Sequence, residues 1–219
     1  MISDEIQRIT AQLPAGVRLV AVSKFHPSEA IREAYAAGQR VFGESHAQEL
    51  QLKHEELSDL QELEWHFIGH LQTNKVKYIA PYVTLIHAVD SPRLLAEIDK
   101  QAQKCGRTIS CLLQLHVAAE ETKFGFTPDE ARAFLDDGSW QALEHVRLSG
   151  VMAMATNTDD TTRIRDDFRR ARRFFEEARQ QYPSFTELSM GMSDDWHIAI
   201  DEGSTLIRIG TQIFGQRQY

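Results

Sequence analysis

The hydrophobic positions of this chain fall into short apolar runs that alternate with segments of helical periodicity. The first run covers residues 19–22, and its unbroken apolar character predicts a strand that is buried on both faces. Similar runs recur along the rest of the chain. We expect strands at 19–22, 40–43, 64–68, 83–89, 108–117, 146–154, 187–189 and 206–209.

The segments between these runs carry the signals of helices. Pro27 and Pro92 stand where a helix would open, Ser91 is a suitable N-cap, and Gly106 stands where a helix would end. Apolar side chains at helical spacing in residues 1–13 predict a further helix that packs down before the first strand. The other helices are expected at 27–37, 44–53, 74–78, 92–104, 128–136, 161–181 and 196–202.

Eight short apolar strands that alternate with helices are typical of a (β/α)8 TIM barrel. A doubly wound open sheet is the competing fold, and the number of strands favours the barrel. The last strand ends about ten residues before the end of the 219-residue chain. We therefore expect the α/β class, with a single-domain barrel over residues 1–219.

Composition and charge narrow the class of protein. Apolar residues make up 42% of the chain and charged residues 26%, as in ordinary soluble globular proteins. No apolar stretch is long enough to cross a bilayer, and Asp4 and Glu5 stand where a secretion signal would be basic. The formal charge of −8 argues against general nucleic-acid binding. We expect a cytoplasmic, monomeric protein with no membrane partner and with free thiols at Cys105 and Cys111.

Lys24 stands at the carboxyl end of the first predicted strand, where a TIM barrel has its active face. An ammonium group that leaves a buried strand is costly unless it has a partner or a chemical task. One interpretation is a structural lysine that pairs with a carboxylate or extends to the rim. The other is a desolvated amine that forms an imine with an aldehyde.

Two glycine-containing segments follow the seventh and eighth predicted strands. Residues 189–195 read SMGMSDD, and residues 208–211 read RIGT. Glycine, hydroxyl side chains and backbone N–H groups suit a phosphate dianion, which barrels commonly hold after these two strands. Either segment alone would be explained as a tight turn or cap. Both together, with an amine at the first strand, point to pyridoxal 5′-phosphate (PLP).

A series of motifs extends this interpretation. The motifs are AVSK at 21–24, FGE at 42–44, WHFIG at 65–69, LQTNK at 71–75, LSMGMSDD at 188–195, GSTLIRIGT at 203–211 and IFG at 213–215. In this order they closely resemble the YggS/PROSC family of pyridoxal-phosphate-binding homeostasis proteins, from the first strand to the end of the chain. The resemblance implies the barrel of the alanine racemase N-terminal domain and a role in vitamin B6 balance, with PLP-dependent apo-enzymes as candidate recipients of the cofactor.

The resemblance also implies roles for individual residues. Lys24 is implied to carry PLP as a Schiff base, and Arg208 is implied to lie near the pyridine nitrogen. The residues implied around the phosphate are Ser193, Gly210 and Thr211. Met192, Glu44 and His66 complete the expected cofactor-binding set.

Two positions depart from the family pattern. The family usually has Asn-Tyr after Phe-Gly-Glu, whereas this chain has Ser45 and His46, so an amide contact to the cofactor ring is not implied here. The family usually has proline after Phe-Ile-Gly, and His70 takes that place. Neither departure touches Lys24 or the phosphate segments.

The role implied for Arg208 has a chemical consequence. A guanidinium only donates hydrogen bonds, so a ring nitrogen that faces it must be an unprotonated acceptor. Such a ring is a weaker electron sink, and we expect a protein that binds and exchanges PLP without efficient catalysis. The alternative for Arg208 is a buried salt bridge to a barrel carboxylate such as Glu44.

The enzymatic alternative is a small PLP-dependent amino-acid racemase or lyase. It would need a base opposite the imine-forming lysine. The candidates for that base are Tyr35, His46, His66 and Lys123. Lys75 and Lys123 are also the amines that compete with Lys24, although a position on the rim is favoured for Lys123.

Metal and anion sites are the remaining alternatives. His66 and His70 are separated by the glycine that ends a strand, so they do not form the helical pair of a zinc site, and we expect no metal. Residues 163–173 contain six arginines, a conceivable anion patch. The acidic residues among them favour a solvated helix face with ion pairs four residues apart.

Overall fold

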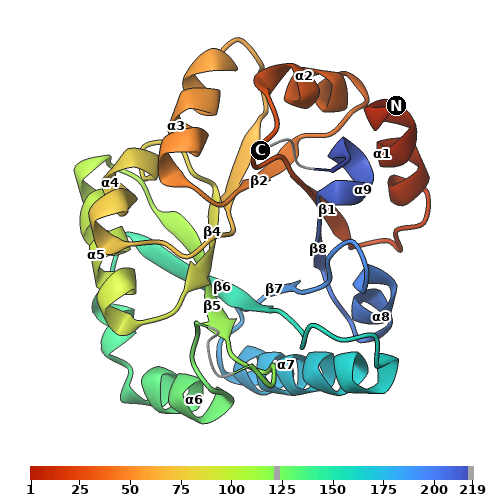
Figure 1. Ribbon diagram of the computed structural model, residues 1–219. Coiled ribbons are helices and arrows are strands. Elements are labelled where there is room, and N and C mark those ends of the chain that lie inside the picture. The colour runs from red at the N-terminus through yellow and green to blue at the C-terminus, as the bar shows by residue number, and fades with distance from the viewer. Residues whose placement is uncertain (121–123, 217–219) are drawn as a thin grey trace.

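The computed structural model describes residues 1–120 and 124–216, and the expected strands close into a barrel. Each strand is parallel to its neighbours in chain order, and the first strand pairs with the last (Figure 1). The (β/α)8 barrel is thereby confirmed. The strands are β1 (Arg18–Val22), β2 (Val41–Glu44), β3 (Glu64–Phe67), β4 (Leu85–Val89), β5 (Ile109–Leu115), β6 (Val146–Ala153), β7 (Glu187–Ser189) and β8 (Leu206–Ile209).

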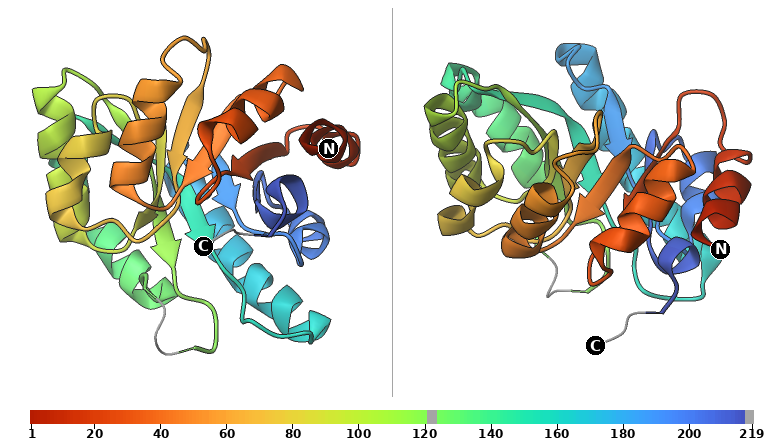
Figure 2. Two further views of the ribbon diagram at one scale, coloured as in Figure 1. Left: turned by 45° about the horizontal axis from the view of Figure 1, so that its top comes forward. Right: turned by 90° about the horizontal axis from the view of Figure 1, so that it is seen from above.

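Helices surround the strands as an outer layer (Figures 1 and 2). They are α1 (Ile2–Thr10), α2 (Ser28–Ala36), α3 (Ala47–Glu56), α4 (Val76–Ile79), α5 (Pro92–Lys104), α6 (Pro128–Asp137), α7 (Thr161–Gln181), α8 (Trp196–Asp201) and α9 (Thr211–Phe214), with 3₁₀ turns η1 (Thr73–Lys75) and η2 (Ser139–Ala142). The bounds of α7 are those predicted, whereas α3 begins three residues later than expected. The prediction lacks α9 and η2, because four residues are too few to show a helical period.

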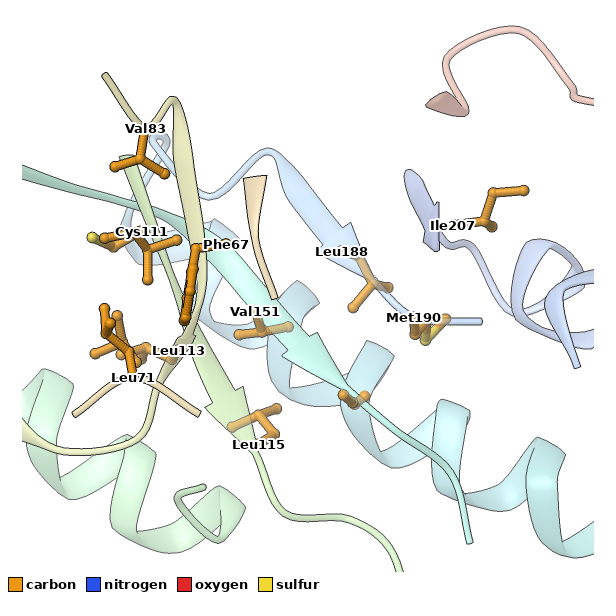
Figure 3. Packing of buried hydrophobic residues seen from close by; sticks show 14 of the residues in the cluster. Phe67, Leu71, Val83, Cys111, Leu113, Leu115, Val151, Leu188, Met190 and Ile207 are labelled. Atoms are coloured by element: carbon orange, nitrogen blue, oxygen red, sulfur yellow. The ribbon is translucent and has the colours of Figure 1, made fainter. Parts of the chain in front are cut away.

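The larger hydrophobic core lies between the strands and the helices. Strand residues of this core, among them Phe67, Leu113, Val151, Leu188 and Ile207, are buried in one cluster with side chains of the helices (Figure 3). Successive side chains of a strand point to opposite faces, so alternate residues of the regular strands belong to this layer, while β4 has an irregularity between Ile86 and Val89, which both lie in it. The outer core therefore fixes which side chains face into the barrel.

A smaller hydrophobic cluster fills the inside of the barrel. It consists of Val20, Val41, Leu85, Ala88, Leu112, Met152 and Leu206. Along β8, Leu206 belongs to this inner cluster and Ile207 to the outer core. Arg208 therefore shares the inner face with Leu206, and it is paired in register with Val20 of β1. A buried guanidinium thus lies inside the barrel near the carboxyl ends of the strands.

The helix before the first strand is present but ends at Thr10. It packs against α2 and α9, with Ile6 and Ile9 as its buried side chains. The backbone N–H of Ile2 donates a hydrogen bond to Oε1 of Glu33 at 3.1 Å. This contact joins the start of α1 to α2.

Further expectations from the sequence concern a helix cap, the thiols and membrane spans. The Ser91 side chain accepts a hydrogen bond from the N–H of Leu94 at 3.3 Å and caps α5, as predicted. Cys111 is fully buried in the outer core, Cys105 is exposed, and both thiols are free. None of the described helices combines the length and apolar character that crossing a bilayer requires.

Candidate functional site

Lys24 lies in a tight turn just beyond the carboxyl end of β1 and is half-buried. The N–H of His26 donates to the carbonyl oxygen of Ser23 at 3.0 Å, and the N–H of Phe25 donates to Oε1 of Glu49 at 2.6 Å. Phe25 has a positive φ of 66°, which is rare for a bulky residue and requires such support. The backbone on the C-terminal side of Lys24 is therefore held by one hydrogen bond within the turn and by one to Glu49 of α3.

A buried polar cluster adjoins this turn and consists of Ser23, Glu44, Glu49 and Lys53; we call it the Glu44 cluster. Oε1 of Glu44 accepts hydrogen bonds from Oγ of Ser23 and Nζ of Lys53, both at 2.7 Å. Nζ of Lys53 also donates to the carbonyl oxygen of Ser23 at 2.8 Å and to Oε1 of Glu49 at 2.7 Å. The cluster joins β1, β2 and α3 at the point where Lys24 leaves the barrel.

Lys53 has no role in the prediction from sequence, although it is only 4% exposed. The signal that could have revealed it is its spacing along α3. Ala47, Leu50 and Lys53 recur every three residues and are the buried positions of that helix. A lysine in step with buried apolar residues, one helical turn after Glu49, indicates an ion pair facing the core.

The carboxyl group of Glu44 is completely buried, and burial raises its pKa to about 7 although the Lys53 ammonium opposes the change. Its second oxygen, Oε2, has no hydrogen-bond partner within the described residues. The side chain faces the helix layer, because Lys53 lies on α3. The structure thus shows Glu44 supporting the Lys24 turn, and its expected contact with the cofactor stays a prediction.

Arg208 of β8 is held by three acceptors inside the barrel. Nη1 donates to the carbonyl oxygen and the hydroxyl of Ser189 at 2.9 and 2.6 Å, and Nη2 donates to the carbonyl oxygen of Ala153 at 3.1 Å. Burial lowers the pKa of Arg208 to about 10, so the guanidinium stays protonated near neutral pH. The alternative of a salt bridge to Glu44 is wrong, because Glu44 pairs with Lys53.

Ser189 links Arg208 to two buried histidines. Oγ of Ser189 lies 2.9 Å from Nδ1 of His87, and Nε2 of His87 lies 2.9 Å from Nδ1 of His66. Burial lowers the pKa of His66 to about 3 and that of His87 well below its usual value, so both rings are neutral near pH 7. The expected contact of His66 with the cofactor stays a prediction. The prediction from sequence gives His87 no role; the signal that could have revealed it is a polar side chain in the otherwise apolar strand β4.

The loops after β7 and β8 are tied to each other. Nε2 of Gln212 donates to the carbonyl oxygen of Ser193 at 2.6 Å. Within the first loop, the N–H of Met192 donates to Oδ1 of Asp195 at 2.6 Å. Ser193 is half-buried, and Met192 is 39% exposed. The two segments predicted to bind phosphate therefore form one continuous part of the barrel mouth.

Close neighbours require glycine at one position of these loops and favour it at another. Gly191 has a φ of 94°, and a Cβ there would lie 2.6 Å from Cβ of Ala199. A Cβ on Gly210 would lie 3.1 Å from the carbonyl oxygen of Val22, which is tighter than ordinary contact. The exposed Thr211 follows Gly210 directly, so backbone N–H groups and a hydroxyl lie on the same side of the mouth as Ser193.

The two departures from the family pattern lie beside each other. Ser45 and His46 follow β2, His70 follows β3, and all three line one cavity of about 210 Å³. A Cβ on Gly69 would lie only 2.3 Å from the carbonyl oxygen of Ser45, so the two loops are in direct contact. Nδ1 of His70 lies 3.1 Å from a carboxylate oxygen of Asp90. Histidine thus makes a polar contact here that proline could not make.

The candidate bases are spread over the molecule. The hydroxyl of Tyr35 donates to the carbonyl oxygen of Gln61 at 2.9 Å, ahead of β3 and at the opposite end of the barrel from Lys24. The His46 side chain is 55% exposed, and its ring centroid lies 5.2 Å from that of Phe25. Among the described candidates, His46 is therefore the one next to the Lys24 turn.

The rival amines occupy different positions. Lys75 lines the same cavity as His46 and His70. Lys123 lies outside the described residues.

The arginines of α7 form ion pairs, partly as predicted. Nε of Arg163 lies 3.4 Å from Oδ1 of Asp167, one helical turn further along. Arg165 and Arg169 instead reach Glu202, at 2.8 and 3.3 Å, just beyond α8. The helix therefore uses its positive charge to bind its neighbour as well as its own acidic residues.

Known proteins resemble this chain in both sequence and fold. Residues 1–218 match the family described as alanine racemase, N-terminal domain. The structure of PipY from Synechococcus elongatus PCC7942 without PLP superimposes with a TM-score of 0.93 at 43% identity, over 98% of this chain and 100% of that chain. The PLP-bound form of PipY gives a TM-score of 0.90. Alanine racemase from Clostridium difficile 630, at 11% identity and a TM-score of 0.78, shares the fold.

Curated relatives narrow the family further. A pyridoxal phosphate homeostasis protein of Aquifex aeolicus (strain VF5) is 41% identical over 203 residues, which are 92% of this chain and 88% of the relative. One from Vibrio alginolyticus is 35% identical over 231 residues, covering 100% of this chain and 98% of the relative. The chain belongs to the alanine racemase N-terminal-domain family and, within it, to the pyridoxal phosphate homeostasis proteins.

Proposed function

We propose that this protein binds PLP and acts in its homeostasis, with Lys24 as the residue that holds the cofactor. The observation that carries the proposal is the half-buried residue Lys24 in a supported turn, at the same barrel mouth as the tied loops after β7 and β8. The relatives support it, because they are named pyridoxal phosphate homeostasis proteins and PipY has a PLP-bound structure.

The residues at this mouth fit a phosphorylated pyridine aldehyde. The phosphate would be held by Ser193, Gly210 and Thr211, because these residues bring hydroxyl and N–H donors to one surface. The absence of a side chain on Gly210 leaves its backbone accessible there. When bound, PLP supplies an aldehyde carbon that is electrophilic toward amines. Lys24 would hold that carbon through Nζ, with loss of one water molecule.

Arg208 would contact the ring nitrogen. The described contacts occupy three of the five N–H donors of its guanidinium, so two remain for a ligand acceptor. A donor that stays protonated favours an unprotonated ring nitrogen. This arrangement supports binding over efficient turnover, because an unprotonated ring withdraws electrons less strongly.

The remaining expected contacts have different local roles in this proposal. Met192 lies on the exposed part of the loop after β7, where it would border the cofactor. Glu44 holds Ser23, the residue before Lys24, from the helix layer. His66 is connected to Arg208 through hydrogen bonds by way of His87 and Ser189.

We further propose a carrier rather than an efficient racemase or lyase, with PLP-dependent apo-enzymes as recipients. His46 is the described candidate base beside Lys24, and its 55% side-chain exposure leaves it in contact with water. Efficient proton abstraction favours a base in a site that excludes water. A racemization assay in deuterated water tests this point, because a carrier should incorporate no solvent deuterium at the α-carbon of amino acids.

The central experiment is an absorption titration with PLP, followed by borohydride reduction and mass mapping of the labelled peptide. We expect a new near-visible band and a pyridoxyl label on Lys24. Lys24→Ala should lose both the band and the label. Lys75→Ala is the matched control, because Lys75 lies at the same barrel mouth in the cavity beside β3, and it should keep both.

Two outcomes would overturn the proposal. A protein that stays colourless with excess PLP has no such site. A label that maps to Lys75 or Lys123 places the reactive amine elsewhere, and the loops after β7 and β8 would then serve a different phosphorylated ligand.

A further inference from the structure

A chain of hydrogen-bonded side chains crosses the inside of the barrel from Arg208 toward its amino-terminal mouth. Nη1 of Arg208 lies 2.6 Å from Oγ of Ser189, which lies 2.9 Å from Nδ1 of His87. Nε2 of His87 lies 2.9 Å from Nδ1 of His66. All four side chains are at most 4% exposed. We call these residues the Arg208 chain.

The hydrogen bonds of the Arg208 chain all run from donor to acceptor in one direction, starting at Arg208. Arg208 can only donate, so the Ser189 hydroxyl accepts from it and has its own hydrogen left to donate. Within the described residues, His87 is the one further partner of that hydroxyl, so Nδ1 of His87 accepts and Nε2 carries the proton. Nε2 of His87 then donates to Nδ1 of His66, whose proton must sit on Nε2.

The surroundings of His66, at the far end of the Arg208 chain, favour the same direction of the hydrogen bonds. Nε2 of His66 lies 3.9 Å from Oε2 of Glu64, at a cavity of about 180 Å³ in the amino-terminal mouth. An N–H directed toward a carboxylate is favourable, whereas a lone pair there would be repelled. A permanent donor at one end and an anion at the other therefore select the same pair of histidine tautomers.

We propose that His87 is a positioning residue for Arg208, and that His66 acts through His87. This inference rests on the proposed function, in which Arg208 donates to the cofactor ring. His87 gives the Ser189 hydroxyl a fixed acceptor, and the oriented hydroxyl then holds Nη1 of Arg208. The two guanidinium donors that remain for a ligand are thereby kept in one orientation.

The alternative protonation states disrupt this arrangement. A second proton on His87 would turn Nδ1 into a donor facing the Ser189 hydroxyl, which would then have to release Arg208 or leave its own hydrogen without an acceptor. Buried donors without acceptors are costly. Burial lowers the pKa of both histidines, which keeps the chain in its neutral, directed form.

Nitrogen NMR of the uniformly labelled protein, without added PLP, tests the direction of the chain. We expect both His66 and His87 as neutral rings with the proton on Nε2 throughout neutral pH. A proton on Nδ1 of His87 would overturn the proposal. Ser189→Ala should relax the constraint and give His87 a mixture of tautomers.

Titration of variants with PLP tests the positioning role. His87→Phe leaves the Ser189 hydroxyl without its acceptor, and we expect PLP affinity to fall by about three- to tenfold, the range for one neutral hydrogen bond. His87→Asn places an amide oxygen near the position of Nδ1 and should restore part of the affinity. His145→Phe is the matched control, because His145 contacts Asp99 outside the barrel, and its affinity should be unchanged.

The results separate the two proposals. If the wild-type protein binds no PLP, the proposed function fails, while the tautomers still report on the chain. If PLP binds with equal affinity to the wild type and to His87→Phe, the positioning role is wrong and the proposed function stands. Should His87→Phe fail to fold, His87→Asn and the tautomers of the wild type decide the question.

Discussion

Nζ of Lys53 lies 2.7 Å from Oε1 of Glu44, and both side chains are almost completely buried. The same ammonium reaches the carbonyl oxygen of Ser23, the residue that precedes Lys24. A buried charge pair adds little net stability compared with apolar residues of the same size, but it is costly to break. The pair therefore fixes the geometry of the strand end that presents the reactive amine.

The first prediction concerns this pair. At pH 9, where the Glu44 carboxyl with its pKa of about 7 is ionised beside Lys53, Lys53→Met should lower the free energy of unfolding by about 3–5 kcal/mol, because Glu44 is left buried without its counter-charge. Urea denaturation measures the change. Adding Glu44→Gln removes the unpaired charge and should recover part of the loss. If Lys53→Met is as stable as the wild type, the pair does not hold the strand end.

The second prediction concerns the loop after β7. Gly191→Ala should destabilise the protein by about 1–3 kcal/mol, because the new methyl group would meet Cβ of Ala199. Gly38→Ala is the matched control, since Gly38 has a similar φ of 99° and open space at its Cβ. It should lose only about 1 kcal/mol, from conformation alone. Thermal or urea unfolding of both variants checks the difference, and equal losses would contradict the packing argument.

The third prediction concerns pH. Burial lowers the pKa of His66 to about 3 in the folded protein, against an ordinary value of 6.5. Between these values the unfolded chain binds more protons, so stability falls as the pH is lowered through this window. Glu44, with its pKa raised to about 7, contributes the opposite trend between 4.5 and 7.

Comparison of variants isolates the histidine contribution. For His66→Gln, the slope of stability against pH between about pH 4 and 6 should fall by about 1.4 kcal/mol per pH unit, the value for one proton. Urea titrations at several pH values measure the slope. A slope that matches the wild type would mean that His66 titrates normally in the folded protein.

The fourth prediction separates the phosphate from the rest of the cofactor. Thr211→Val should weaken PLP binding by about tenfold or more, the worth of a hydrogen bond to a charged group, and leave pyridoxal binding unchanged. Thr186→Val, at the amino-terminal mouth, should change neither. Absorption titrations with both compounds give the affinities. Equal weakening for PLP and pyridoxal would place Thr211 away from the phosphate.

Much of the fold follows from local pattern. The strands from 187 to 189 and from 206 to 209 have the predicted bounds, because each follows a predicted helix at the place where the alternation of helices and strands requires the next strand. The position of Lys24 after β1 follows from the same pattern. Both glycine-containing loops after β7 and β8 also lie where the sequence places them.

The residues behind the site were not predictable in this way. His87 and Lys53 owe their roles to partners that are 102 and 9 residues away, Ser189 and Glu44. Such contacts depend on which strand face is inside and on the closure of the barrel. The Arg208–Glu44 alternative was wrong for the same reason: Glu44 faces the helix layer and Arg208 faces the interior.

The Arg208 chain also determines how protons can travel through this molecule. A proton moves along a hydrogen-bonded row only if each member can accept on one side and release on the other. Arg208 has no lone pair with which to accept one, so the row ends at the guanidinium. The Arg208 chain therefore cannot relay protons from the amino-terminal mouth to a ligand at Lys24.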